Sequence, residues 1–306
     1  MIPLLAEATP VRPARHGDGP VWDDAAGELL WVDTAGQVRW GRVDPGGRVS
    51  DLAVRPVGQS VGAVAPTTTP AWLLAAGSGF RGLTPDGEVT VLLDLTEEAA
   101  ADTPMRSGAC DRAGRFFAGT GGRHETPGAG SLYRVDLDGT VVAVLTGLVV
   151  VAGIAWSPDD DVLYLADSGA RTVTAFDYDV DLGTLGRPRV LLEFDGDGPG
   201  TPHGLAVDRA GHLWIALWGA GEVRQYSPAG TLEAVVRVRA TRATGCAFAG
   251  PALDVLVVST ASAEGLSVRE QAIQPDAGRL FTTRPPDVLG RPAFPYRGPV
   301  RGLTRV

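Results

Sequence analysis

The sequence contains no lysine, because all 27 of its basic residues are arginines. This absence excludes a lysine Schiff base and a lysine general base. Cysteine is also scarce, with only Cys110 and Cys246 in 306 residues. Two cysteines cannot form a disulfide framework, so stability has to come from packing. We expect a reducing compartment, the cytoplasm.

Positive charge and long apolar runs are lacking as well. The formal net charge is −9 and the isoelectric point is about 5.0, which argues against nucleic acid or an anionic membrane as the main partner. The stretch that comes closest to a membrane span, residues 141–156, is short and interrupted by Gly147 and Gly153. Residues 1–15 lack the basic start of a signal peptide. We expect neither a nucleic-acid nor a membrane partner.

Glycine and proline, in contrast, are abundant, with 41 and 23 residues. Such a composition suits many short strands joined by tight turns. No long window shows an apolar period of 3.6 residues with helix caps at its ends. The composition therefore favours strands over helices.

Six segments of the chain resemble one another, each with a glycine followed by a short apolar run. A second apolar strand follows each segment, after a turn rich in Asp or Gly that is typical of a hairpin. A unit of three or four strands that recurs every 40 to 50 residues or so is typical of a propeller blade. Residues 1–306 are therefore predicted to form a single all-β domain, a six-bladed β-propeller. The repeat glycines are Gly19, Gly62, Gly108, Gly153, Gly204 and Gly245.

The first strand of each blade lines the central channel of a propeller. Because side chains alternate along a strand, the residue before each repeat glycine is expected at an equivalent place in every blade. This channel ring comprises Asp18, Val61, Ser107, Ala152, His203 and Thr244.

Three residues at or beside the ring are candidates for chemistry. His203 is predicted to act as a general base, because the pKa of histidine suits proton transfer near neutral pH; a substitution without a role is the alternative. Asp18 would orient His203 or hold a water, unless it only bonds the backbone of its own turn. Arg106, next to the ring in the third blade, would bind a carboxylate or phosphate of a ligand or else pair with Asp18.

Further side chains are candidates for substrate contact. Ser107 and Thr244 belong to the ring. His124 lies in a loop over one face, where a solvated surface role competes with a functional one. Trp218 lies either at the mouth of the channel or in the packing between blades, and His16 flanks the channel entry. The sequence has no nucleophile elbow, phosphate loop or dinucleotide fingerprint.

Several blocks of the chain resemble the gluconolactonase (senescence-marker-protein, regucalcin) family. They include GPVWD at 19–23, the long blocks at 153–179 and 203–223, and QPDAGRLF at 274–281. The resemblance spans nearly the whole chain. It implies a six-bladed propeller with a divalent metal in the central channel, and hydrolysis of lactones or related esters.

The same resemblance implies metal ligands at three ring positions, which hold Asp18, Ala152 and His203 in this chain. Alanine cannot ligate, and histidine replaces an oxygen ligand. Calcium takes six or more oxygen ligands, whereas zinc accepts His and Asp but normally has three protein ligands in a catalytic site. Zinc on Asp18 and His203 thus fits better than calcium, and a site without metal is favoured over both.

Together these residues predict a divergent gluconolactonase-like hydrolase. Its substrate would be a lactone or a related small polar molecule bound in the central channel. Two alternatives remain open. One is a metal-independent cyclase, isomerase or lyase of a specialised pathway, which would use His203, Asp18 and Arg106. The other is a non-catalytic propeller that binds a small molecule.

Overall fold

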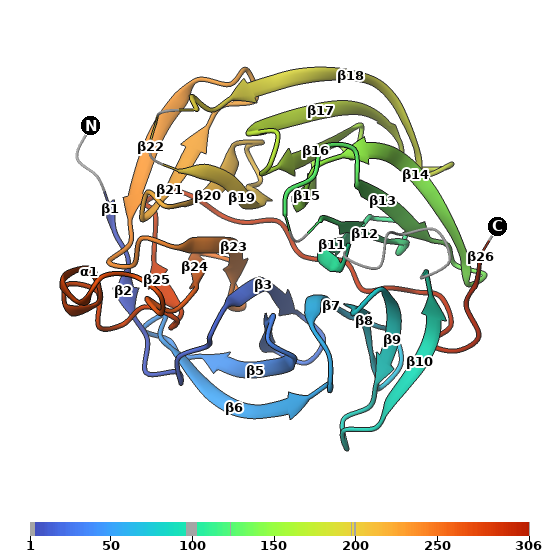
Figure 1. Cartoon of the computed structure of the whole chain (residues 1–306), viewed down its shortest axis with the longest axis horizontal. Helices are drawn as coiled ribbons and strands as arrows, with labels where there is room; N and C mark the ends of the chain where they lie inside the picture. Colours follow the sequence, from blue (N-terminus) through green and yellow to red (C-terminus); the bar gives the residue numbers. More distant parts are fainter. Residues whose placement is uncertain (1–3, 96–102, 123, 197, 199, 306) are drawn as a thin grey trace.

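The protein is described by a computed structural model that covers residues 4–95, 103–122, 124–196, 198 and 200–305. In this part of the chain six sheets of four or five strands are arranged around a central axis (Figure 1). The prediction of an all-β, six-bladed β-propeller is therefore confirmed.

Each sheet is built from consecutive antiparallel strands that run from the centre outward. The innermost strands are β3 (Gly17–Asp23), β7 (Val61–Pro66), β11 (Met105–Cys110), β15 (Val151–Trp156), β19 (Thr201–Val207) and β23 (Ala243–Ala249). The second strands are β4 (Glu28–Asp33), β8 (Trp72–Ala76), β12 (Phe116–Thr120), β16 (Val162–Asp167), β20 (Leu213–Trp218) and β24 (Val255–Thr260).

The third strands are β5 (Gln37–Val43), β9 (Gly79–Leu83), β13 (Gly130–Val135), β17 (Thr172–Asp179), β21 (Glu222–Tyr226) and β25 (Phe281–Thr283). The outer strands are β6 (Val49–Pro56), β10 (Val89–Asp94), β14 (Thr140–Leu148), β18 (Thr184–Glu193), β22 (Leu232–Arg237) and β2 (Glu7–Ala8). Because β2 pairs with β25, the start of the chain completes the last blade and closes the ring of sheets.

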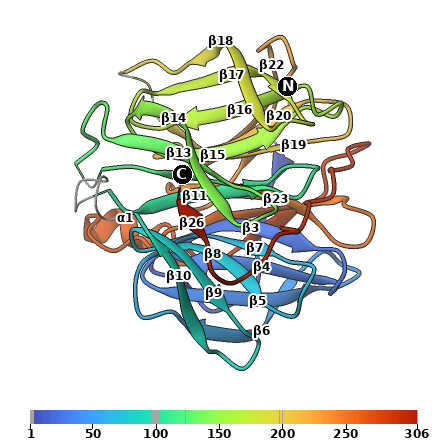
Figure 2. The ribbon, with the colours of Figure 1, turned by 90° about the vertical axis from the view of Figure 1, so that its right-hand side faces the viewer.

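Three short elements lie outside this four-strand pattern. Strand β1 (Leu4–Leu5) adds to β22 in parallel, and β26 (Thr304–Arg305) adds in parallel to β14, a pair that can be followed in Figure 2. Helix α1 (Val268–Ala272) lies between β24 and β25. No helix in the described part of the chain is long and apolar enough to span a membrane.

The repeat glycines let neighbouring inner strands approach closely. A Cβ atom at Gly62 would lie 2.4 Å from the carbonyl oxygen of Arg106, and one at Gly153 would lie 2.7 Å from that of His203. A side chain at either position would therefore push two blades apart, which is the physical reason for the repeated glycine.

All six inner strands also carry a bulge beside the repeat glycine. At each bulge the register with the second strand shifts, and such irregularities re-aim side chains. The direction in which each ring side chain points is consequently set by the bulge as well as by the alternation of side chains along the strand. The shifts lie between Asp18 and Val21, Val61 and Ala63, Met105 and Gly108, Val151 and Gly153, Pro202 and Leu205, and Ala243 and Gly245.

Apolar and aromatic side chains fill the spaces between adjacent blades. Phe117 of the third blade meets Trp156 of the fourth edge-on, with ring centroids 5.4 Å apart. Trp214 of the fifth blade meets Phe248 of the sixth in the same way, at 5.6 Å. Such aromatic contacts hold neighbouring sheets together and fix the diameter of the channel between them.

Candidate functional site

The inner strands begin at a polar end of the channel, where three ionisable side chains meet. Asp18 projects from β3, His203 from β19, and His16 immediately precedes β3. One carboxylate oxygen of Asp18, Oδ2, lies 3.9 Å from Nε2 of His16 and 4.0 Å from Nδ1 of His203. Blades one and five are not neighbours in the ring, yet their side chains reach each other across the channel.

Hydrogen bonds to the backbone hold two of these side chains in place. The other Asp18 oxygen, Oδ1, accepts the N–H of Gly19 at 2.8 Å. Nδ1 of His203 lies 2.8 Å from the carbonyl oxygen of Thr244. A carbonyl can only accept, so Nδ1 carries the proton and the lone pair of the neutral ring lies on Nε2.

Trp218, at the end of β20, packs against both histidines. Its ring is stacked on that of His16 with centroids 5.3 Å apart, and on that of His203 at 5.8 Å. The guanidinium of Arg242 lies 5.4 Å from the Trp218 centroid on the channel rim. Trp218 therefore fixes the planes of both imidazoles and forms part of the mouth of the channel, the first of the two placements expected from the sequence.

Arg106 supplies a positive charge to the same space. It projects from β11, and its Nε donates a hydrogen bond to the carbonyl of Gly121 at 3.3 Å. With His16, Asp18, Ala152 and His203 it lines a cavity of about 200 Å³, called here the upper cavity. Arg106 is thus held at its base while its charge acts on Asp18 and both histidines.

Burial changes the ionisation of all three central groups. Loss of water raises the pKa of Asp18 from 3.8 to about 7, although the Gly19 N–H and Arg106 act in the opposite direction. Burial, the facing His203 and Arg106 lower the pKa of His16 to about 3. The pKa of His203 falls to about 4, again mainly through burial. At neutral pH both imidazoles are neutral, and Asp18 is near the midpoint of its titration.

The other residues singled out from the sequence have different surroundings. Ser107 lies further along the channel, in the wall of a second cavity. The Thr244 hydroxyl is fully buried and bonded to the Gly17 carbonyl at 2.6 Å and to Ser259 at 2.9 Å. Thr244 therefore contributes its backbone carbonyl, which orients His203, rather than a hydroxyl that faces a ligand. His124 is exposed in a turn after β12, away from the described cavities.

His16 is the functional residue that sequence reasoning undervalued. It stands two positions before Asp18 in the string HGD at 16–18. Residues two apart on a strand share a face, so this spacing is a signal that the two side chains point into the same space.

The donors at the polar end do not make up a usual metal site. In the described residues no group of three or more His, Cys, Asp or Glu side chains is arranged to hold a metal ion. Ala152 offers no donor. Nδ1 of His203 is engaged by Thr244, and Oδ1 of Asp18 is engaged by Gly19. His16, Asp18 and His203 thus offer three side chains, but they are not arranged as a metal-binding group, and the six or more oxygen ligands of calcium are lacking.

Comparisons with known proteins agree with the architecture. The family model described as "SMP-30/Gluconolactonase/LRE-like region" matches residues 16–262. A pentonolactonase of Haloferax volcanii is 36% identical over 289 residues, which cover 92% of this chain and 94% of the relative. The regucalcin of Danio rerio is 31% identical over 288 residues, which cover 92% of this chain and 95% of the relative.

Solved structures show the same arrangement of blades. A regucalcin from Agrobacterium tumefaciens, described as a calcium-binding protein, aligns with a TM-score of 0.86 at 26% identity and covers 97% of this chain and 100% of that one. A luciferin-regenerating enzyme aligns with a TM-score of 0.83 at 24% identity, covering 93% and 96%.

Proposed function

Because the chain belongs to the SMP-30/gluconolactonase/LRE-like family, as its residue blocks predicted, we propose that it hydrolyses a lactone or related ester in the upper cavity. The substrate is a small molecule, and the protein acts in the cytoplasm without a nucleic-acid or membrane partner. The observation that carries the proposal is the carboxyl group of Asp18 between two neutral imidazoles, with a guanidinium in the same cavity. Lactonase names among the relatives support the choice of reaction.

Asp18 is the proton acceptor in this proposal. A general base works best when its pKa is close to the working pH, and the pKa of Asp18 is about 7. The ionised carboxylate takes a proton from a water molecule as the water oxygen adds to the lactone carbonyl. The protonated carboxyl then returns the proton to the ring oxygen as the carbon–oxygen bond breaks. One water is consumed, and the product is the open hydroxy acid.

Arg106 and the histidines complete the step. Arg106 stabilises the negative charge that develops on the carbonyl oxygen, the role that fixed positive groups have in acyl transfer. With a pKa of about 4, His203 is a weak base at neutral pH. The proposal therefore exchanges the roles expected from the sequence: His203 and His16 position Asp18 and the substrate, and Asp18 moves the proton.

No step in this scheme passes through a metal ion. The proposal includes the altered metal site that the sequence led us to expect. Ala152 has no side chain that could bind a metal, and Nδ1 of His203 and Oδ1 of Asp18 already form hydrogen bonds to the backbone. Asp18, which accepts and returns the proton, and Arg106, which stabilises the developing charge, carry the hydrolysis.

The test is turnover of a panel of pentono- and hexonolactones, followed by proton release at pH 8. Asp18→Asn is expected to lower kcat/KM by about 100-fold or more, the usual contribution of a positioned base. Asp159→Asn, which changes an exposed carboxylate in the turn after β15, is the matched control. A fully active Asp18→Asn protein would refute the assignment. Conversion to an isomer instead of a hydroxy acid would replace hydrolysis by the cyclase, isomerase or lyase alternative.

A further inference from the structure

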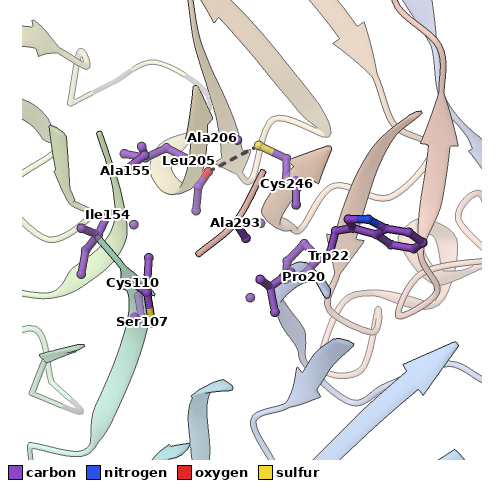
Figure 3. A pocket seen from close by; sticks show the side chains of 18 of the residues that line it. Pro20, Trp22, Ser107, Cys110, Ile154, Ala155, Leu205, Ala206, Cys246 and Ala293 are labelled. Atoms are coloured by element: carbon purple, nitrogen blue, oxygen red, sulfur yellow. Dashed lines mark hydrogen bonds between the residues drawn. The ribbon is translucent and has the colours of Figure 1, made fainter. Parts of the chain in front are cut away.

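A second cavity lies in the same channel, beyond the ring of residues that precede the repeat glycines. Its volume is about 170 Å³, and the second halves of the inner strands enclose it. Figure 3 shows Pro20, Ile154, Leu205 and Cys110 around this space, here called the lower cavity. The wall is mostly apolar, although Asp18, Ser107, Asp160 and Arg291 also line it.

The two cysteines of the chain belong to this apolar wall. Burial raises the pKa of Cys246 to about 12 and that of Cys110 well above its usual value. Both thiols are therefore neutral at physiological pH. The Cys246 thiol also donates to the carbonyls of Gly204 and Trp214, at 3.9 and 3.2 Å. Both cysteines line the cavity as small apolar groups and not as nucleophiles.

The chain after β25 crosses the far end of the lower cavity and lines it. Residues 284–303 cross that face of the propeller as an extended segment (Figure 1), and Ala293 lies across the space in Figure 3. Arg291 anchors the segment, because its guanidinium donates to the carbonyls of Trp156 and Ser157 at 2.9 and 2.5 Å and to Asp160 at 2.9 Å.

Two further contacts fix this segment on opposite blades. Gly290 bridges to Asp208 of the fifth blade, and the fully buried Tyr296 bridges to Thr67 of the second. The backbone N–H of Tyr296 also donates to the Pro66 carbonyl at 2.8 Å. The segment that lines the far end of the lower cavity is thus anchored on three blades.

At the ring, the upper and lower cavities share two wall residues. Asp18 and Ala152 line both of them. Ala152 is the position at which the family resemblance implies a metal ligand, and its single methyl group leaves the centre of the channel without a polar side chain on that side. A group bound next to Asp18 therefore lies beside the apolar space as well as in the upper cavity.

We propose that the lower cavity binds an apolar alkyl substituent of the substrate, so that the preferred lactone carries a hydrocarbon chain. The inference rests on the proposed function for its reaction, but the cavity itself predicts the chain. An engineered apolar cavity of about 150 Å³ admits benzene, and about 170 Å³ accordingly accommodates roughly six carbons. The carbonyl lies with Asp18 and Arg106, and the chain points toward Ile154 and Leu205.

Binding of unbranched alkan-1-ols tests the cavity without any chemistry. Calorimetry from 1-propanol to 1-octanol is expected to show affinity rising about fourfold per methylene, the gain from burial of one methylene, up to about six carbons and then levelling. Ala155→Leu fills the space from β15 and is expected to weaken 1-hexanol at least tenfold. Ala25→Leu, at an exposed turn position, is the matched control and is expected to bind like the wild type.

A variant that enlarges the cavity tests the same inference in the other direction. Ile154→Ala removes three carbons from the wall and is expected to move the levelling point to longer alcohols. Affinity that is independent of chain length in the wild type, or unchanged by both Ala155→Leu and Ile154→Ala in proteins with wild-type circular dichroism, overturns the proposal.

Turnover of γ-lactones with 4-methyl to 4-hexyl substituents links the cavity to catalysis. The expected result is a kcat/KM that rises with chain length in the wild type and not in Ala155→Leu. A kcat/KM that does not depend on the length of the alkyl substituent overturns the inference but leaves the proposed function standing. Chain-dependent binding of the alcohols without hydrolysis of any lactone supports the cavity assignment and refutes the lactonase function.

Discussion

Replacement of Asp18 by Asn is expected to stabilise the protein in a strongly pH-dependent way. Asp18 is 9% exposed, and its pKa rises from 3.8 to about 7 on folding. Between these two pH values the unfolded chain is ionised at this position while the folded chain keeps the proton. Unfolding therefore releases a proton, and a rise in pH favours the unfolded state.

The magnitude follows from the pKa shift. A change from 3.8 to about 7 corresponds to about 4 kcal/mol of unfolding free energy, lost by the wild type as the pH rises to 8. Asparagine resembles the protonated acid and keeps an oxygen for the Gly19 N–H, so the variant avoids this loss. The difference between the two proteins is expected to be below about 1 kcal/mol at pH 4 and about 4 kcal/mol at pH 8. His16 and His203 are present in both proteins and largely cancel.

Urea unfolding followed by tryptophan fluorescence at pH 4, 6 and 8 measures this difference. Asp159→Asn is the control, because an exposed side chain has nearly the same surroundings in both states. A difference that does not change with pH, or a variant less stable than the wild type at pH 8, would refute the assignment of Asp18 as a buried carboxyl with a raised pKa. Greater stability together with lost turnover would identify Asp18 as a residue retained for function at a cost in stability.

Three further outcomes are expected. For the wild type, a plot of kcat/KM against pH is expected to rise around pH 7, because Asp18 ionises there. In His203→Ala water reaches Asp18 and lowers its pKa, so this rise is expected at lower pH. A rise at the same pH in both proteins contradicts a positioning role for His203. Arg106→Gln lowers kcat/KM by about 100-fold through loss of charge stabilisation, and wild-type kinetics would remove it from the step. Dialysis against a chelator is expected to leave turnover unchanged, and elemental analysis measures the metal that remains. Loss of turnover that added zinc or calcium restores would support a metal mechanism instead.

The architecture could be predicted from local pattern alone. The repeated glycines mark places where inner strands touch, as at Gly62 and Gly153, and the apolar runs that follow them are the second strands of the blades. These features recur six times and depend on neighbours along the chain, so the blade count needed no tertiary information. The ring positions of Asp18 and His203 followed from the same repeat.

The chemistry of the site was decided by the tertiary structure. His203 reaches His16 and Asp18 only because the ring of blades closes, and Trp218 is stacked on both histidines from the strand next to β19. Burial in that closed ring raises the pKa of Asp18 and lowers that of His203, which is why the proposed function assigns the proton transfer to Asp18.

The sequence by itself thus determined the six blades, the family and the polar ring residues, because these follow from periodicity and from motifs along the chain. The orientation of Thr244, the stacking of His16 on Trp218, and the anchoring by Arg291 of the segment that lines the lower cavity follow from contacts between residues far apart in the sequence. No periodic pattern encodes such contacts, since they depend on how the blades pack around one channel.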